Sequence, residues 1–397
     1  MLAAATAPAL APDPEACQTL RHVALFTQDM SGGGAFTTVF ASYARALARS
    51  GVRKIDLVTV RGDPARSEIP FPDRSRAVPL GGGGAGGAVL PLARYLEREQ
   101  PDVLISGPIV PNLAACLARR LARRWRGRLV LSHHHPLDLA RRQTWKNSPT
   151  LVRLLYPTAD ASFAVSPGVR EDAVRVARTD PRRTACIPVP VPPAGAGGAP
   201  PPHPWLRPDG RERPLFLTVG RLEPVKNLSL LLEGFRRAAG VSGGRLLVVG
   251  EGSAESGLPG AIRAAGLGDR VALTGRVPST LPYYRGADVF VLTSDEEGYG
   301  LVLLEAMREG VPVISTDALG SGPRFLLDGG AAGRLIPRND PCALAGAMIE
   351  LSAADRRDVL RAAASRRLAA LSPERIGAQL TRFLSDGRAV GTGLAAR

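Results

Sequence analysis

Short apolar runs alternate with helix-like segments through the first half of the chain. The apolar runs cover residues 22–26, 55–60, 103–106, 129–132 and 161–165. Runs that are apolar at consecutive positions predict strands buried on both faces, as in a parallel sheet covered by helices. Helical patterns over residues 37–50 and 113–125 stand between the runs, and another begins at about Arg170. Residues 21–187 are therefore predicted to form a parallel α/β domain.

The second half repeats this alternation. Apolar runs at 215–219, 245–249, 271–277, 289–292 and 311–315 predict strands, and helical patterns cover 228–239, 281–285, 340–351 and 355–371. The run and helix order predicts a second α/β domain over residues 215–372. A last amphipathic pattern over 373–384 predicts a helix, and we expect the C-terminal segment of about 373–397 to pack back on the first domain.

The segment between the two predicted domains is rich in proline. Ten prolines and several glycines lie between residues 188 and 214, which excludes a helix or a central strand and predicts an extended linker. The whole chain has 397 residues, too many for one typical core. Residues 1–20 contain Pro8, Pro12 and Pro14 and lack a basic leader, so a disordered tail is expected instead of a signal peptide.

The stretch from Ser294 to Glu305 has the strongest chemical signature. It follows the strand predicted at 289–292 and leads into a helix, and such strand-to-helix turns bind ligands in open α/β sheets. Gly298 and Gly300 permit a tight bend that leaves amides at a helix start, where phosphate is favoured. Glu297 and Glu305 would accept hydrogen bonds from sugar or ribose hydroxyls. The stretch therefore predicts a nucleotide-sugar site.

Two further strand-end loops carry candidate binding residues. Arg221 and Lys226 lie five positions apart before a helix, which suits a diphosphate, although a surface loop with incidental charges would look similar. The glycines of residues 31–34 allow a ligand to approach the backbone, or form only a tight turn. This loop is not the dinucleotide fingerprint, because Thr37 stands where the third glycine would be. An NAD-dependent dehydrogenase is therefore the least favoured enzyme class.

Three consecutive histidines, His133, His134 and His135, end the strand predicted at 129–132. They cannot all face one metal ion, and no carboxylate or cysteine stands near them in sequence to complete a zinc site. We expect one imidazole to point into a cleft and donate to a sugar oxygen. The four cysteines are far apart, which argues against a zinc site or a disulfide framework, and no metal or cofactor is predicted.

The net charge is +15 and the pI is about 10.7. Six arginines crowd residues 119–128, which would suit anionic lipid or an acidic partner, or simply form a solvated face. Nucleic acid is disfavoured because aromatic residues make up only 5% of the chain and no binding motif is present. No apolar run is long enough to cross a bilayer. We expect the protein to remain in the cytoplasm, with peripheral contact at the inner membrane face as one option.

Five motifs in this order together resemble the family 4 glycosyltransferases of the GT-B fold. They are Gly220-Arg221 with Lys226-Asn227, Gly250-Glu251-Gly252, Ala287-Asp288-Val289-Phe290, Ser294 with Glu297-Gly298-Tyr299-Gly300, and Glu305-Ala306-Met307. The resemblance runs from about His22 to Leu384. It implies two Rossmann-like domains that face across a cleft, with the donor held mainly by the C-terminal domain and the acceptor by the N-terminal domain.

The resemblance also implies a role for each matching residue. Arg221 and Lys226 would bind the diphosphate, Glu297 the donor sugar, and Glu305 the ribose. His134 is the best match to a histidine near the sugar, with the register open between His133 and His135. The remaining donor-binding positions are the main chain of Val277 at the base, the glycine loop at Gly33 and Gly34, and the amides of Gly298, Tyr299, Gly300, Leu301 and Val302 at the phosphates.

Two positions depart from the family pattern. Phe325 stands where a glutamate is common after Gly322-Pro323-Arg324, and Pro188 stands where an asparagine is common before the interdomain crossing. Neither supplies the main donor contacts, but both weaken a transfer of sugar specificity by analogy.

The function that the resemblance implies is retaining, metal-independent transfer of a hexosyl or N-acetylhexosaminyl group. The donor would be a nucleotide sugar, with UDP the first expectation, and no Asp-x-Asp motif for a metal is present. The acceptor would be a carbohydrate, a glycolipid or a small molecule, in cell-envelope or natural-product biosynthesis. Two other classes stay open: an epimerase or phosphorylase of the same architecture, and a non-catalytic nucleotide-sugar-binding module.

Overall fold

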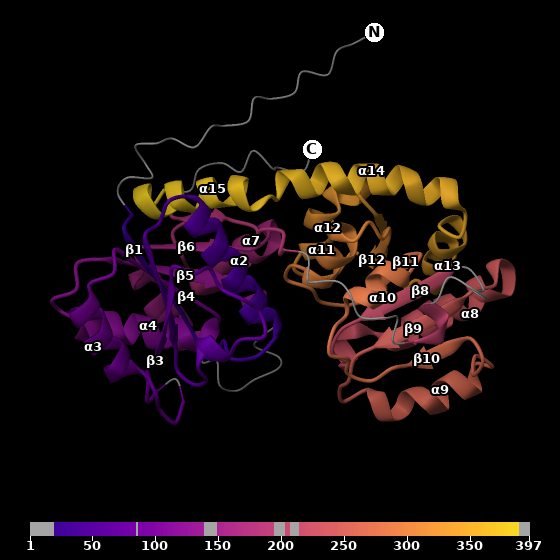
Figure 1. The fold of residues 1–397 in the computed structure, drawn as a ribbon, viewed down its shortest axis with the longest axis horizontal. Coiled ribbons are helices and arrows are strands. Elements are labelled where there is room, and N and C mark those ends of the chain that lie inside the picture. The colour runs from indigo at the N-terminus through magenta and orange to yellow at the C-terminus, as the bar shows by residue number, and fades with distance from the viewer. Residues whose placement is uncertain (1–19, 85, 139–148, 194–202, 207–213, 389–397) are drawn as a thin grey trace, which may run out of the picture.

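The structure is a computed structural model. It describes residues 20–388 except 85, 139–148, 194–202 and 207–213. The predicted tail therefore lies outside the described residues, apart from Leu20, which is buried against the first domain. Figure 1 shows two α/β domains side by side, with the two last helices along one edge of both.

Seven parallel strands form the sheet of the N-terminal domain within the described residues. Their order across the sheet is β3-β2-β1-β4-β5-β6-β7. The strands are β1 (His22–Thr27), β2 (Lys54–Thr59), β3 (Ser75–Pro79), β4 (Val103–Ser106), β5 (Arg128–His133), β6 (Ala161–Ala164) and β7 (Thr184–Cys186). The order reverses beside β1, so the strand-end loops of β1 and β4 flank a topological switch point, where ligands bind in this architecture.

Helices cover both faces of this sheet because its strands alternate between two apolar cores. In β1, Val23 and Leu25 face one core, and Ala24 and Phe26 face the other. The first core also contains α2 and α7, and the second contains α3, α4 and α6. The helices are α2 (Ala35–Arg49), α3 (Val89–Glu99), α4 (Ile109–Leu121), α6 (Pro149–Leu155) and α7 (Pro167–Ala177).

The C-terminal domain has the same design with six parallel strands among its described residues, in the order β10-β9-β8-β11-β12-β13. The strands are β8 (Leu215–Val219), β9 (Arg245–Val249), β10 (Val271–Leu273), β11 (Val289–Leu292), β12 (Val313–Thr316) and β13 (Arg334–Ile336). The helices are α8 (Leu228–Ser242), α9 (Leu258–Ala264), α10 (Leu281–Gly286), α11 (Leu301–Arg308), α12 (Gly322–Leu326), α13 (Pro341–Glu350), α14 (Ala354–Ala370) and α15 (Pro373–Asp386). The predicted α/β class is confirmed.

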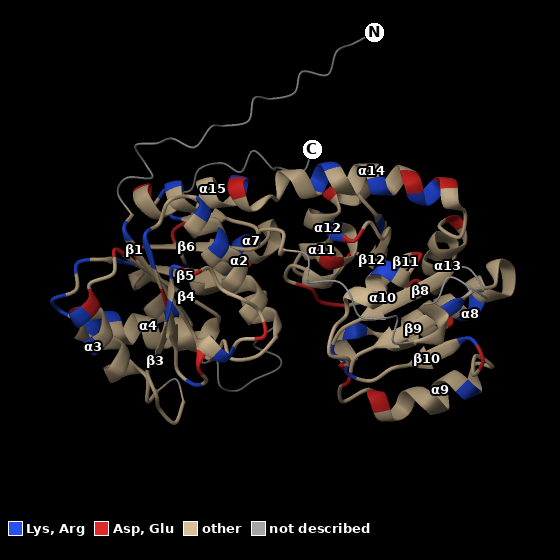
Figure 2. Ribbon diagram, in the orientation of Figure 1, with Lys and Arg blue, Asp and Glu red and all other residues tan. Residues whose placement is uncertain are grey.

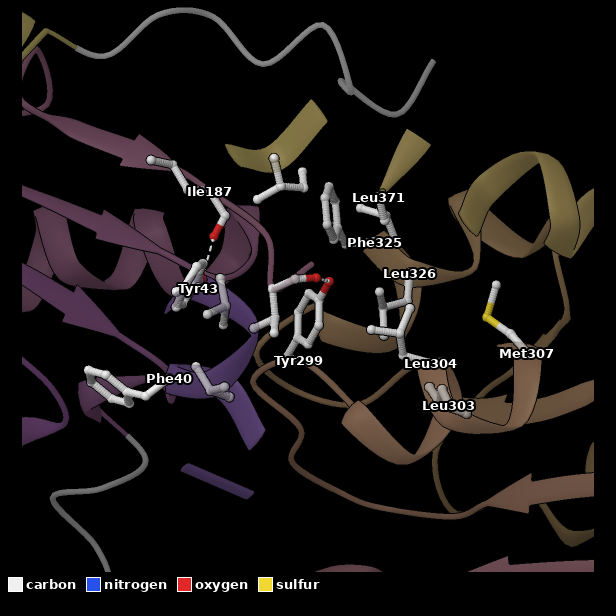
Figure 3. Close-up of a cluster of buried hydrophobic side chains, with 14 of the residues drawn as sticks. Phe40, Tyr43, Ile187, Tyr299, Leu303, Leu304, Met307, Phe325, Leu326 and Leu371 are labelled. Atoms are coloured by element: carbon white, nitrogen blue, oxygen red, sulfur yellow. Dashed lines mark hydrogen bonds between the residues drawn. The ribbon is translucent and has the colours of Figure 1, made fainter. Parts of the chain in front are cut away.

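The chain crosses between the domains twice. After β7 it enters the C-terminal domain, and after α14, which packs on α11, it returns as α15, which packs on α2. Tyrosines from the two domains hold the first crossing, because the Tyr43 hydroxyl donates to Ile187 O at 3.0 Å and the Tyr299 hydroxyl to Val189 O at 2.8 Å. Figure 3 shows both contacts inside an apolar cluster that includes Phe325 and continues from one domain into the other.

Several elements were missed or displaced in the sequence interpretation. Strand β3 is a half-exposed edge strand, and β7 and β13 have three residues each, so none has the long apolar run that marks a central strand. Helix α4 runs from Ile109 to Leu121, four residues earlier than predicted at each end. Pro111 falls in its first turn, where a missing N–H costs nothing, so it did not mark a boundary. No helix among the described residues has the length and apolar content needed to cross a bilayer.

A buried carboxylate ties the amino-terminal ends of β1, β2 and β3 to α3. Asp56 is fully buried and accepts hydrogen bonds from Arg76, from Tyr95 at 2.6 Å and from His22 at 2.9 Å. Burial alone would raise the pKa of Asp56, but the hydrogen bonds from His22, Arg76 and Tyr95 outweigh it and hold the pKa well below its usual value. All these partners are intramolecular, so the cluster stabilises the fold at the edge opposite to the strand-end loops.

Replacing Asp56 by Asn should lower the free energy of unfolding by on the order of 3 kcal/mol, because it removes the buried charged acceptor that Arg76, Tyr95 and His22 bind. A lowered folded-state pKa stabilises above the unfolded pKa of about 4 and loses that contribution as the pH falls further. Wild type should therefore lose more stability between about pH 5 and pH 3 than Asp56→Asn does. Thermal unfolding across this range is the measurement, with the exposed Asp355→Asn as control. Equal stability of both variants would contradict the assignment.

Candidate active site

A cavity of about 320 Å³ lies between the carboxyl-end loops of the two sheets. The N-terminal domain contributes the loop after β1, the start of α4 and the histidine segment. The C-terminal domain contributes the loops after β8 and β11. The lining residues that matter below are Phe36, Asn112, His133, His134, His135, Arg221, Lys226, Glu297 and Gly298. Five residues predicted for the site therefore meet at one cavity: His134, Arg221, Lys226, Glu297 and Gly298.

The loop that carries Arg221 and Lys226 is fastened to the loop that carries Glu297. The Thr293 hydroxyl donates to Lys226 O at 2.8 Å, and the amide of Asp295 donates to Val225 O at 2.9 Å. Asn227 caps α8 by accepting from Leu230 N, and its side-chain amide donates to Asp295 at 3.0 Å. These contacts keep the two charged loops in a fixed relation before any ligand is bound.

The Gly250-Glu251-Gly252 turn packs against the backbone of the Arg221 loop. A Cβ at Gly250 would overlap Gly220 O, and a Cβ at Gly252 would overlap the backbone of Leu222. The amide of Leu222 also donates to Glu251 O at 2.8 Å. Two backbones approach too closely here for any larger residue, which explains the glycine spacing of this motif.

Lys226 and Glu297 form an ion pair in the cavity wall. The Lys226 Nζ lies 2.7 Å from Glu297 Oε2, and the two side chains are 22% and 13% exposed. An ammonium group has three N–H donors, so one contact to Glu297 leaves Lys226 able to reach a further anion. The pair thus joins a cationic and an anionic binding group at one point.

Glycine is required at positions 298 and 300 for different structural reasons. Gly298 has no left-handed backbone, but a Cβ there would overlap the carbonyl oxygen of His134 in the opposite domain. Gly300 has φ 97° and caps α11, which has no side-chain cap and no acidic residue in its first turn. The Ser166 hydroxyl, also from the N-terminal domain, is 2.8 Å from Gly298 O. Gly298 therefore permits the contact between domains, and Gly300 leaves the α11 amides able to meet an anion.

The three histidines have three different environments. His133 and His134 are buried, with 3% and 6% exposure, and burial lowers their pKa values to about 4 and about 3. His135 is exposed within the cavity. Burial of the His135 ring against the cavity walls lowers its pKa. The negative charge of Glu297 raises this pKa, and the positive charges of Lys226 and Arg221 lower it. Of the three histidines, His135 is thus the one whose pKa depends on the charged loops.

The proton on His134 can be assigned from its neighbours. The Ser132 hydroxyl donates its single proton to Ser106 O at 2.8 Å, so at 3.0 Å from His134 Nε2 it can only accept. His134 therefore carries its proton on Nε2, and Nδ1 is an acceptor. With Nε2 directed at Ser132, His134 can offer only Nδ1, an acceptor, to the cavity. All three histidines line the cavity, and which imidazole meets a sugar oxygen stays a prediction.

Several residues predicted to bind the donor lie outside the cavity lining. They are Gly33, Gly34, Val277, Tyr299, Gly300, Leu301, Val302 and Glu305. The Tyr299 side chain is 4% exposed and binds the interdomain crossing, so only its main chain could face a ligand. Glu305 is half-buried, and its Oε2 accepts from the Tyr284 hydroxyl at 2.9 Å. Burial raises the pKa of Glu305.

The two sequence departures are explained by burial. Phe325 packs in the apolar cluster between the domains, where Arg367 lies over its ring at 4.7 Å. Pro188 is buried in the crossing between the carbonyls that Tyr43 and Tyr299 bind. Neither position lines the cavity.

Phe36 is the main cavity residue that the sequence interpretation missed. Its ring lies edge-on to His134 at 5.4 Å and to His135 at 5.9 Å. It follows Gly34 by two positions, so the glycine loop serves to place an aromatic ring against the histidines. The only signal in the sequence was an apolar residue at the first turn of a helix, which usually marks a core position.

No group of three or more His, Cys, Asp and Glu side chains is arranged to hold a metal ion in the part of the chain that the structure describes. Lys226 and Arg221 are the cationic groups at the cavity.

Two parallel Rossmann-like domains that face across a charged cavity define the GT-B class. Family profiles agree: "Glycosyltransferase Family 4" matches residues 32–194, and "Glycosyl transferases group 1" matches residues 213–354. Together these segments cover most of the chain. The protein belongs to the family 4 glycosyltransferases.

Curated relatives match a little over a third of the chain. The lipopolysaccharide core biosynthesis glycosyltransferase LpsE of Rhizobium meliloti is 30% identical over 142 residues, which is 36% of this chain and 40% of that protein. The phosphatidyl-myo-inositol mannosyltransferase of Mycobacterium leprae is 36% identical over 150 residues, 36% of this chain and 38% of that one. The matches thus span about two fifths of these relatives.

Solved structures share the fold over nearly the whole chain. Anabaena Alr3699/HepE in complex with UDP and glucose superposes with a TM-score of 0.71 and 17% identity, covering 92% of this chain and all of that one. At this identity the likeness concerns the fold.

Replacing Gly298 by Ala should separate the domains at the cavity, because the added methyl group would overlap the carbonyl oxygen of His134 in the opposite domain. We expect a loss of about 1–3 kcal/mol in the free energy of unfolding, typical of overpacking, and a larger radius of gyration. Thermal unfolding and small-angle X-ray scattering measure the two effects. Gly260→Ala is the control, since open space surrounds Gly260 in α9. Unchanged scattering and stability in Gly298→Ala would show that the domains do not touch here.

Proposed function

We propose that the protein is a retaining glycosyltransferase that moves a sugar from a nucleotide diphosphate sugar to an acceptor hydroxyl. One observation carries the proposal: Arg221, Lys226 and Glu297 from the C-terminal domain meet the histidine segment of the N-terminal domain at one cavity. Cations for a diphosphate, a carboxylate for sugar hydroxyls and a neutral imidazole are the groups that sugar transfer from a diphosphate needs.

The diphosphate binds to protein groups without a metal ion. The Arg221 guanidinium offers a bidentate fork, and Lys226 offers the N–H groups that Glu297 does not use. The uncapped start of α11 adds amides that favour negative charge. Together they neutralise the leaving group as the bond to the sugar breaks.

Sugar recognition falls to Glu297 and His135. The Glu297 carboxylate accepts hydrogen bonds from sugar hydroxyls while Lys226 holds its Oε2. His135, with a lowered pKa, is neutral at physiological pH and can both donate and accept.

The transfer step balances without an added base. The bond from the anomeric carbon to the diphosphate oxygen breaks, and the acceptor oxygen attacks the same face of the sugar, so the anomeric configuration is retained. The acceptor proton passes to the departing phosphate oxygen. Glu297 stabilises the oxocarbenium-like charge that develops between the two events.

The nucleotide extends from the cavity towards α11. Glu305, fixed by the Tyr284 hydroxyl, binds the ribose hydroxyls, and the main chain of Val277 in the loop after β10 meets the base. UDP is the first nucleotide to test, because HepE, which shares the fold, is described in complex with UDP and glucose. The transferred group is a hexosyl or N-acetylhexosaminyl unit.

The acceptor occupies the side of the cavity formed by the N-terminal domain. Two relatives act in lipopolysaccharide core biosynthesis and on phosphatidyl-myo-inositol, as their names state. These precedents favour an acceptor from cell-envelope biosynthesis, carbohydrate or glycolipid, over a small-molecule natural product.

Replacing Lys226 by Ala should lower kcat by about 10²–10³, because one of the groups that stabilise the leaving diphosphate is lost. Arg221→Ala should have a similar effect. The assay is release of UDP from UDP-sugars in the presence of candidate acceptors. Arg236→Ala removes one charge from a surface ion pair on α8 and serves as control. Wild-type turnover in both site variants, with folding intact, would refute the phosphate assignment.

Incubation with the donor alone separates this proposal from the two other classes. A transferase releases UDP slowly by hydrolysis and leaves the configuration of the remaining donor unchanged. An epimerase would convert the sugar while it is still attached to UDP. A binding module would stabilise the fold with UDP-sugar and release nothing under any condition.

A further inference from the structure

Leucine side chains are exposed on three neighbouring helices of the N-terminal domain. Among the described residues, eight large apolar side chains are exposed, and five of them lie on α3, α4 and α6. They are Leu90 (58%), Leu117 (40%), Leu121 (51%), Leu151 (46%) and Leu154 (60%). Helix α4 contacts both α3 and α6, so these five leucines belong to one continuous helical layer. We refer to them as the leucine face.

The positions of these leucines follow the helical period. Leu117 and Leu121 are one turn apart on α4, and Leu151 and Leu154 share one face of α6. Their neighbours Ala118, Val152 and Leu155 point inward and are buried. A helix that covers a sheet normally presents charged residues on the outer side, so an apolar outer ridge indicates a function.

The arginines near this face divide into two groups. Arg119 and Arg128 are structural: Arg119 donates to Gly127 O at 2.8 Å, and Arg128 donates to Leu384 O at 2.7 Å on α15. The exposed ones are Arg120 on α4, Arg123, Arg124 and Arg126 just after α4, Arg153 on α6, and Arg94 and Arg98 on α3. Of these, Arg153 also donates to Val176 O at 3.2 Å. The sequence holds no acidic residue between Asp102 and Asp138. The positive charge is therefore uncompensated within this segment.

Acidic groups that face the leucine face from α3 are already paired. Glu99 binds Arg76 at 2.7 Å and Lys54 at 3.0 Å, and Glu97 accepts from the amide of Arg124 at 3.2 Å. Figure 2 shows that α3 carries both basic and acidic residues. The surface therefore consists of apolar ridges flanked by arginine side chains.

We propose that the leucine face and its arginines dock on an anionic membrane. Apolar side chains on convex ridges can enter the boundary between headgroups and acyl chains, while arginines meet the lipid phosphates. The exposed leucines match the apolar boundary layer of a bilayer, and the arginines beside them match its negative charge. Apolar character and charge together therefore favour an anionic lipid surface.

The same helix connects this surface to the cavity. Helix α4 begins at Ile109, which lines the cavity, and Leu117 lies eight residues later, about 12 Å along the helix. Docking on α4 and α6 thus holds the acceptor side of the cavity within reach of the headgroup layer. Resting on the proposed function, this deepens it: the acceptor hydroxyl is carried on a membrane lipid.

Vesicle sedimentation tests the proposal. Full-length protein is mixed with vesicles of phosphatidylglycerol and phosphatidylcholine, or of phosphatidylcholine alone, at low and high salt. We expect binding to the anionic vesicles only. The double variants Leu121→Gln/Leu154→Gln and Arg123→Glu/Arg124→Glu should each bind on the order of tenfold or more weakly. The control Val241→Gln/Val359→Gln changes equally exposed residues on α8 and α14 and should bind as wild type.

Three outcomes would overturn the proposal. The first is no vesicle binding by the wild type, and the second is equal binding by the leucine variant. The third is a wild-type dimer in size-exclusion chromatography that the leucine variant dissociates, because this face would then bind a second copy. Thermal stabilisation by UDP, measured without vesicles, is read in parallel. Loss of UDP binding alone would contradict the proposed function and leave membrane docking standing.

Discussion

The structure depends on the buried crossing between its two domains. Tyr43 from the first domain and Tyr299 from the second bind carbonyls only two residues apart, at Ile187 and Val189. The surrounding apolar cluster is continuous across the boundary, and α15 returns to pack on α2. A backbone fixed from both sides in this way holds the carboxyl ends of the two sheets against each other, which is what creates a site between them.

The site has its form because the domains touch through backbone. Gly298 lies under the His134 carbonyl, so Glu297 on one side and His135 on the other are neighbours across the cavity. Lys226 reaches the same point because its loop is fastened to residues 293–295. Lys226 and Glu297 are paired at 2.7 Å. In the proposed function, Lys226 would contact the diphosphate and Glu297 the sugar. The charged groups are thus preorganised before the donor binds.

Much of this was predictable from the sequence, and the exceptions have physical causes. Long apolar strands and the charged loops after them were correctly placed, because strand burial and glycine turns are local signals. The edge strand β3 was missed because it is half-exposed. The structural role of the Tyr299 side chain could not be read from the sequence, because its contact with Val189 spans 110 residues. The histidine register could not be read from three identical residues. The structure distinguishes them by environment, because Ser132, which binds Ser106, contacts His134, while the charged loops affect the pKa of His135.

Hydrogen–deuterium exchange with and without UDP tests the central claim most directly, because it locates the nucleotide along the chain. We expect slower exchange in residues 220–227 and 294–302, which are proposed to hold the diphosphate, together with the histidine segment 133–137 across the cavity. Residues 89–99 of α3, which do not line the cavity, should exchange as before. Protection confined to the glycine loop at 31–34, with no change in the two charged loops, would contradict the account.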